Sequence, residues 1–219
     1  DQSQLINMLI FGALSVIVVA GVVFINEGRR QITVQYARRF MGGREGGTGA
    51  QTYLPLRVNQ AGVIPIIFAV SLVLVPSFAG SYLSGLPQPQ LSSLGRFLAV
   101  NFNPSSLTYN AVYFLLVVGF TFFYTAVIFN PTKVADEIKK YGGFIPGIRP
   151  GTQTAAFLNY IMIRITLAGA VFLGTVAILP SIASQITGIQ TLVLGGTGLL
   201  IVVSVILDTA KQFESKMIE

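Results

Sequence analysis

The sequence predicts an all-α membrane protein of five transmembrane helices, with a small β-hairpin in the loop that follows the first. The first observation is a set of five apolar stretches that contain no Lys, Arg, Asp or Glu. They cover 5–25, 61–86, 107–130, 165–186 and 189–207. A bilayer core of about 30 Å needs about 20 apolar residues as a helix. The second observation is that only 10% of the residues are charged, against about 25% in soluble domains.

The charge of the connecting loops predicts the orientation of the helices. Eleven of the fourteen Lys and Arg residues lie in two alternate connections, residues 26–60 and 131–164. Short loops that are rich in Lys and Arg remain in the cytoplasm. We therefore expect an N-terminus outside, a C-terminus inside, and a single transmembrane unit over residues 1–219.

A five-helix unit that starts outside is typical of the later half of a transport protein. Many such proteins pair two units of opposite topology about an axis in the membrane plane. The sequence begins at Asp1, without an initiator Met or a signal-peptide pattern. We expect a preceding N-terminal half and a ten-helix whole.

The first basic loop alternates polar and apolar residues, which is typical of strands. Residues 31–37 and 52–58 are predicted to pair as a hairpin, with Pro55 tolerated because both strands are edges. The glycine-rich tip, 42–49, would present its arginines to the cytosol. These are Arg38, Arg39 and Arg44. They could form a docking surface, or they could serve only as positive charges that set the topology.

The second basic loop carries strong local signals. Asn130 and Pro131 suit the start of a helix over 132–141, which Gly142 and Gly143 would end. Two Pro-Gly pairs then frame Arg149 in tight turns. The purely structural interpretation is a rigid turn before the fourth helix. The functional interpretation is an arginine held out for an acidic or phosphate partner.

The residue types present exclude several classes of function. The chain has no His and no Cys, so a thiolate or imidazole metal site and a cysteine nucleophile are absent, and no cofactor is predicted. The apolar stretches contain no ionisable groups that could bind an ion or relay protons. The chain is therefore not expected to be an enzyme, and an ion-coupled carrier is disfavoured.

Three segments closely resemble the C-terminal half of the SecY family, the central subunit of the bacterial protein-conducting channel. They are TYLPLRVNQAGVIPII (52–67), FNPTKVADEIKKYGGFIPGIRPGTQT (129–154) and GGTGLLIVV (195–203). The resemblance covers essentially the whole chain and places its helices as the sixth to tenth of that family. The glycine-rich hairpin tip departs from the family pattern.

The resemblance implies a role for individual residues. Ile67 and Ile201 match the hydrophobic pore ring that surrounds a translocating chain. Asn59 matches a polar residue of the lateral gate, of which the second and third helices would form one side. Six basic residues would dock the SecA motor or the ribosome: Arg38, Arg39, Arg44, Lys139, Lys140 and Arg149.

The resemblance also implies partners and a location. The partners are the N-terminal half of SecY, SecE, SecG, SecA, the ribosome, preprotein signal sequences and the lipid bilayer. The location is the inner membrane of a bacterium, with a thylakoid-type membrane as an alternative. Two other functions stay open: half of an inverted-repeat secondary transporter, and a membrane-embedded insertase or scaffold without a pore.

Overall fold

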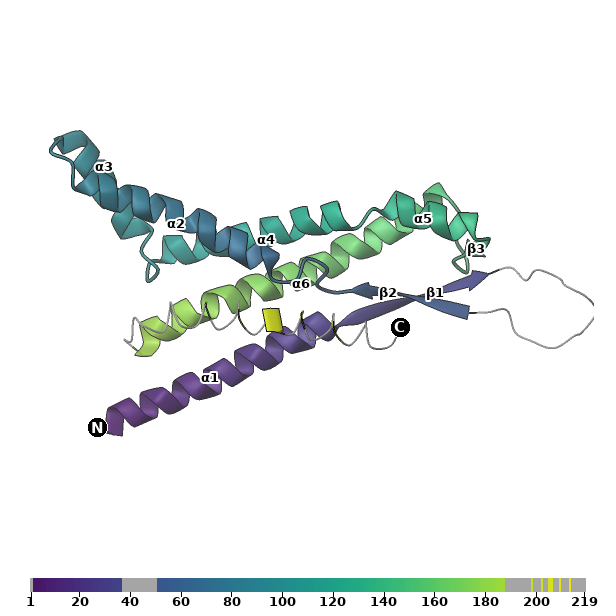
Figure 1. Cartoon of the computed structure of the whole chain (residues 1–219), viewed down its shortest axis with the longest axis horizontal. Helices are drawn as coiled ribbons and strands as arrows, with labels where there is room; N and C mark the ends of the chain where they lie inside the picture. The colour runs from purple at the N-terminus through teal and green to yellow at the C-terminus, as the bar shows by residue number, and fades with distance from the viewer. Residues whose placement is uncertain are drawn as a thin grey trace, which may run out of the picture.

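The computed structural model describes residues 2–36 and 51–187, and six single positions beyond them (198, 202, 205, 206, 209 and 213). Its elements are α1 (Gln2–Glu27), β1 (Arg29–Tyr36), β2 (Gln51–Arg57), α2 (Ile64–Ser84), α3 (Pro89–Asn101), α4 (Leu107–Ile128), α5 (Pro131–Lys140), β3 (Gly143–Phe144) and α6 (Thr152–Thr187). The long helices run along the long axis of the molecule, with the strands at one end and α3 at the other (Figure 1).

The described part supports a largely helical membrane protein with a small antiparallel sheet. The helical stretches of α2, α4 and α6 are each long and apolar enough to cross a membrane. The helix α1 covers the predicted span 5–25. The predicted fifth span, 189–207, lies outside the continuously described residues, so the count of five helices and their orientation stay predictions.

The predicted helix boundaries need two corrections. The fourth predicted span starts at Ile165, but α6 already begins at Thr152. Much of the predicted loop 131–164 is therefore helical, because a helix can continue past the apolar core of a bilayer while an Arg such as Arg164 keeps its charge in water. The second span begins at Ile64 and not at residue 61, since Gly62 adopts a φ of 62° that a helix does not allow.

The helix α3 was not predicted, and it is held against α2 by two glycines. A Cβ added to Gly80 would lie 2.6 Å from the backbone nitrogen of Ala99, and one added to Gly95 would lie 2.6 Å from the carbonyl carbon of Leu83. Small residues allow such close helix approach in membranes. The two helices thus form a tight hairpin.

The predicted hairpin is present as β1 and β2, an antiparallel pair in which Gln31 lies opposite Pro55. A third strand that the sequence analysis missed, β3, pairs with the end of β1 through Gln35 and Tyr36, so the sheet order is β2-β1-β3. Pro55 does lie on an edge strand, where a missing N–H is tolerated. The expectation that β1 is also an edge strand is wrong over its last residues.

Two apolar cores lie along α6. The first core joins the sheet, α5 and the first half of α6. Its members are Ile32, Val34, Leu56, Ala135, Ile138, Ile145, Ala155, Leu158, Ile161, Met162 and Ile165. The second core joins α2, α4 and the second half of α6. Its members are Ile66, Ala69, Val73, Tyr109, Tyr113, Val117, Leu173 and Ala177.

The close crossing of α2 and α3 makes a testable prediction. Gly95→Ala should lower the free energy of unfolding of the full-length protein in detergent by about 1–3 kcal/mol, because the added methyl group overlaps the backbone of α2. The melting temperature should fall accordingly. The matched control is Gly119→Ala in α4, where nothing lies within 4 Å of the added Cβ. Equal melting temperatures for the two variants would contradict the close crossing.

Candidate functional site

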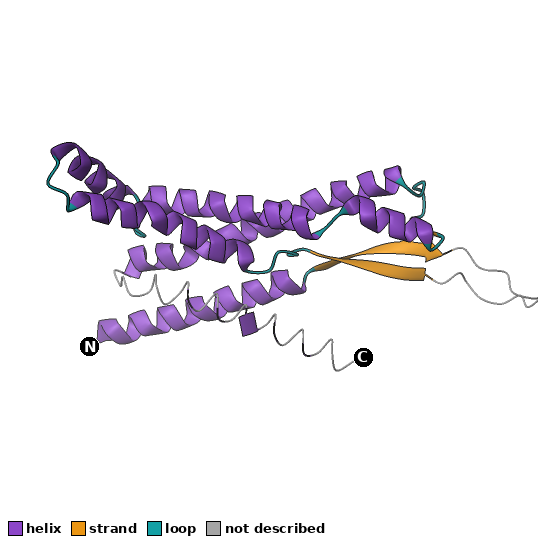
Figure 2. Ribbon diagram, turned by 45° about the horizontal axis from the view of Figure 1, so that its top comes forward, coloured by secondary structure: helices purple, strands orange, loops and turns teal. Residues whose placement is uncertain are grey.

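The two basic loops of the sequence meet in one structural unit, which we call the platform (residues 29–36, 51–57 and 131–151). Its strands and α5 lie beside each other at one end of the molecule (Figure 2). The platform rests on the first half of α6, where Leu158 is fully buried in the first core. The charged residues of the second loop therefore sit on a packed support and not on a free loop.

The helix α5 places two cations at the edge of the platform. The side-chain oxygen of Asn130 accepts hydrogen bonds from the backbone nitrogens of Thr132 (3.1 Å) and Lys133 (3.2 Å), which confirms the predicted helix start. Lys139 and Lys140 lie in the last turn, both exposed. A cation at this end of a helix is favoured by the helix dipole.

The turns around Arg149 are as predicted. The nitrogen of Ile148 donates to the carbonyl oxygen of Ile145 at 3.0 Å, and Gly147 has a φ of 81°. These are the features of a type II turn, with proline and glycine at its two central positions. On the other side, the hydroxyl of Thr154 donates to the carbonyl oxygen of Arg149 at 2.9 Å. The backbone of Arg149 is thus held on both sides while its side chain is exposed.

Lys139 and Arg149 line the same open cavity of about 570 Å³. Its wall is formed by Phe144, Ile145 and Ile148. Neither cation forms an ion pair with any residue in the described ranges. A hollow with an apolar wall and two cations suits an acidic protein segment or a phosphate group. Lys140 does not line it.

Asn59 lies in the connector between β2 and α2, before the first residue of α2. It is buried, and its Nδ2 donates to the carbonyl oxygen of Gly62 at 3.0 Å. The preceding residue, Val58, donates its N–H to the carbonyl oxygen of Gly28 at 2.8 Å. Its own carbonyl oxygen would lie 2.8 Å from a Cβ placed on Gly169 of α6. The connector is therefore held between the residue that follows α1 and the helix α6.

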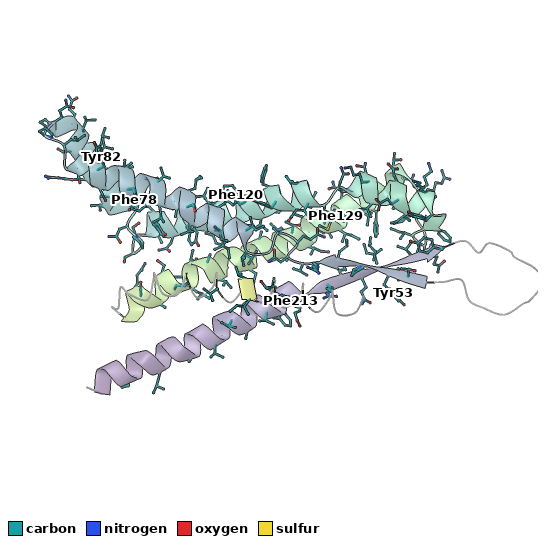
Figure 3. All side chains as sticks on the ribbon, in the orientation of Figure 1. Tyr53, Phe78, Tyr82, Phe120, Phe129 and Phe213 are labelled. Carbon is teal, nitrogen blue, oxygen red and sulfur yellow. The ribbon has the colours of Figure 1, made fainter. Side chains whose placement is uncertain are left out.

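Ile67 lies on a continuous exposed stripe along α2, with 37% of its surface accessible. The stripe consists of Ile64, Ile67, Phe68, Leu72, Val75, Phe78 and Tyr82. Phe78 and Tyr82, near the C-terminal end of α2, are labelled in Figure 3. The predicted partner of Ile67 in the pore ring, Ile201, lies outside the described residues, and so do Arg38, Arg39 and Arg44.

Sequence analysis missed two contributors to the site. The hydrogen bond from Thr154 to Arg149 had a weak signal, because a threonine at the start of a helix often bonds to nearby backbone. The strand β3 had none, since a two-residue strand carries no periodic pattern. No group of three or more His, Cys, Asp or Glu that could hold a metal occurs within the described part of the chain.

A family model, SecY, matches residues 1–210 of this chain. The chain belongs to the SecY family. Relatives named protein translocase subunit SecY include that of Mycobacterium bovis, 48% identical over 94% of this chain and 48% of the relative. That of Chlamydia trachomatis is 48% identical over 98% of the chain and 47% of the relative. That of Thermus thermophilus is 44% identical over 99% of the chain and 48% of the relative.

The chain spans about half the length of these curated relatives. The match confirms the resemblance to the SecY family, and the names of the relatives agree with the prediction that the chain is not an enzyme. Together with the apolar helices, it supports a multi-pass membrane protein with bacterial relatives. The roles of individual residues are taken up as proposals.

The turn before Arg149 can be tested directly. Gly147→Val should speed amide hydrogen exchange at Ile148 roughly tenfold, because a left-handed conformation costs a residue with a Cβ about 1–2 kcal/mol. Gly147→Asn is the matched control, since asparagine tolerates this conformation. Exchange that is equally slow in both variants would show that the turn does not depend on a glycine.

Proposed function

We propose that this chain is the pore-forming and gate-forming half of a SecY channel, which passes unfolded preproteins across the membrane and releases signal or transmembrane segments into it. The observation that carries the proposal is the SecY match over residues 1–210, with relatives named as subunits of protein translocase. The absence of charged residues in α2 and α4 supports a channel over the alternative of an ion-coupled carrier half.

The proposed pore ring includes Ile67 and Ile201. A ring of branched apolar side chains can exclude water and ions by dewetting and can still deform around a polypeptide. The partial exposure of Ile67 supports this role, because a pore-ring residue must face away from the core of its own half. The remaining residues of the ring would come from the N-terminal half of the protein.

The proposed lateral gate uses Asn59 and the helices α2 and α4. The apolar stripe on α2 supports the gate, since a hydrophobic segment that leaves sideways into lipid requires an apolar wall. The connector that contains Asn59 is the only covalent link from the sheet to α2 within the described residues. It is therefore suited to transmit a movement of the platform to the gate.

The platform is proposed to dock the cytoplasmic partner, either SecA or the ribosome. Its cations would be Lys139, Lys140 and Arg149, with Arg38, Arg39 and Arg44 of the hairpin tip. SecE and SecG would complete the complex, in the inner membrane of a bacterium. The support is the open cavity with Lys139 and Arg149 at its wall and no carboxylate among its lining residues.

The pore-ring proposal predicts a leak. Ile67→Asn should raise ion conductance of the full complex several-fold and loosen the discrimination between signal sequences, because an amide in the constriction retains water. Conductance across planar bilayers measures the leak. The matched control is Ile163→Asn on the exposed side of α6, which should leave it unchanged. An unchanged leak in the Ile67 variant would remove this residue from the ring.

The docking proposal predicts an effect of charge at the cavity. Arg149→Glu should strongly impair translocation driven by SecA and leave assembly of the complex intact, since Arg149 is exposed and outside the apolar core. Lys133→Glu, an exposed cation of the same loop that does not line the cavity, serves as the control.

Crosslinking from position 149 then identifies the partner. Adducts with SecA or with components of the ribosomal exit tunnel support docking. Adducts with lipid headgroups alone, or loss of assembly in the Arg149→Glu variant, would return this residue to the role of a topology charge or a structural turn.

A further inference from the structure

The hairpin of α2 and α3 presents a surface that neither the pore, the gate nor the platform uses. The helices run antiparallel, since Gly80 lies against Leu98 and Ala99 while Gly95 lies against Leu83. This crossing fixes which side of α3 faces α2 and which side faces outward.

The position of α3 along the molecular axis coincides with the ends of the membrane helices. The linker after α3 is bound to the end of α6, because the hydroxyl of Ser181 donates to the carbonyl oxygen of Pro104 and Nε2 of Gln185 donates to that of Ser105 at 2.9 Å. The next residue, Ser106, caps the start of α4. The helix α3 therefore lies beside the ends of these helices, at the end of the molecule opposite the platform (Figure 1).

The outward side of α3 is apolar. Leu94, Phe97 and Val100 recur at a spacing of three residues and are 57%, 64% and 70% exposed. The same end of α2 exposes Phe78 (71%) and Tyr82 (76%). Tyrosine, whose ring carries a polar hydroxyl, is enriched where a membrane meets water. Because Gly80 and Gly95 face each other and 3.6 residues complete a helical turn, the apolar side of α3 faces away from α2, on the opposite side of the hairpin from Phe78 and Tyr82.

Three polar side chains of α3 donate hydrogen bonds to the backbone of their own helix. The hydroxyls of Ser92 and Ser93 donate to the carbonyl oxygens of Pro89 (3.1 Å) and Gln90 (2.9 Å). Nδ2 of Asn101 donates to the carbonyl oxygen of Phe97 at 2.8 Å. A helix that satisfies these donors internally can enter a layer of low water content at a smaller desolvation cost.

One cation accompanies this apolar side. Arg96 is the only Lys, Arg, Asp or Glu between Arg57 and Lys133. It is exposed, and it forms no ion pair with a described residue. A guanidinium group beside an apolar helix face suits the phosphate of a lipid headgroup, which it can bind through two parallel hydrogen bonds.

We propose that α3 is an interfacial anchor. Leu94, Phe97 and Val100 enter the boundary between headgroups and acyl chains on the side of the membrane opposite the platform, and Arg96 binds lipid phosphate. Lipid is favoured as the occupant over a protein surface because α3 lies at the ends of helices that are apolar enough to cross a membrane, and because its exposed Arg96 suits a headgroup phosphate. The anchor would hold the end of α2 at a fixed depth.

Fluorescence quenching of the full-length protein tests the anchor. A single cysteine is introduced at Phe97 or, as the matched control, at exposed Gln88 in the turn of the same hairpin. Each variant is labelled with a fluorophore on an otherwise cysteine-free background and placed in vesicles of phosphatidylcholine and phosphatidylglycerol. Nitroxide-bearing lipid should quench the label at 97 several-fold more than that at 88, and aqueous iodide should show the reverse. Val100→Cys replaces Phe97→Cys if the latter does not fold.

Two results would overturn the anchor. Equal quenching of both positions by iodide would place α3 in water, and resistance of position 97 to both quenchers would mean that protein covers it. The phosphate contact has its own test in the Phe97→Cys background. Arg96→Glu should reduce quenching by nitroxide lipid while Arg96→Lys preserves it, and unchanged quenching with Arg96→Glu would rule out that contact.

Discussion

The arrangement of this chain depends on one helix, α6, that is longer than a membrane requires. Its 36 residues correspond to about 54 Å, whereas the hydrocarbon layer is about 30 Å thick. The surplus carries Leu158 and its neighbours, on which the sheet and α5 pack. The remainder carries Leu173 and Ala177, on which α2 and α4 pack. One helix therefore supports both the platform and the bundle of α2 and α4.

The two cores are also joined at the connector between β2 and α2. Val58 is hydrogen-bonded to Gly28 and lies against Gly169, so the chain is fixed at the point where it leaves the sheet. Beyond that point, the positive φ of Gly62 redirects it into α2. The helix α2 packs mainly on α3 and α4 and only slightly on α6. The chain is therefore held to α6 mainly at the connector, whereas α2 itself is held mainly by α3 and α4.

The features that sequence analysis predicted correctly are those with a local cause. Apolar length predicted α2 and α4, Asn130 predicted the start of α5, and Pro146-Gly147 predicted the turn before Arg149. The missed features depend on residues far apart in the chain. The strand β3 exists because the end of β1 is available to pair with it, and α3 is held in place because Gly80 and Gly95 meet. The early start of α6 was missed because a run of apolar residues indicates where a helix can cross a membrane and does not indicate where the helix begins.

The positions of the glycines explain which helices of this chain pack closely and which helix surface remains without a close neighbour. Lipid is as apolar as leucine, so helix association in a membrane relies on close packing more than on hydrophobicity. Glycine provides that packing between α2 and α3, and again where Gly174 of α6 meets the ring of Phe114 of α4. The exposed stripe of α2 contains no glycine and is composed mostly of large apolar residues. Such a surface is poorly suited to a permanent tight helix contact and well suited to one that opens, as the proposed lateral gate must.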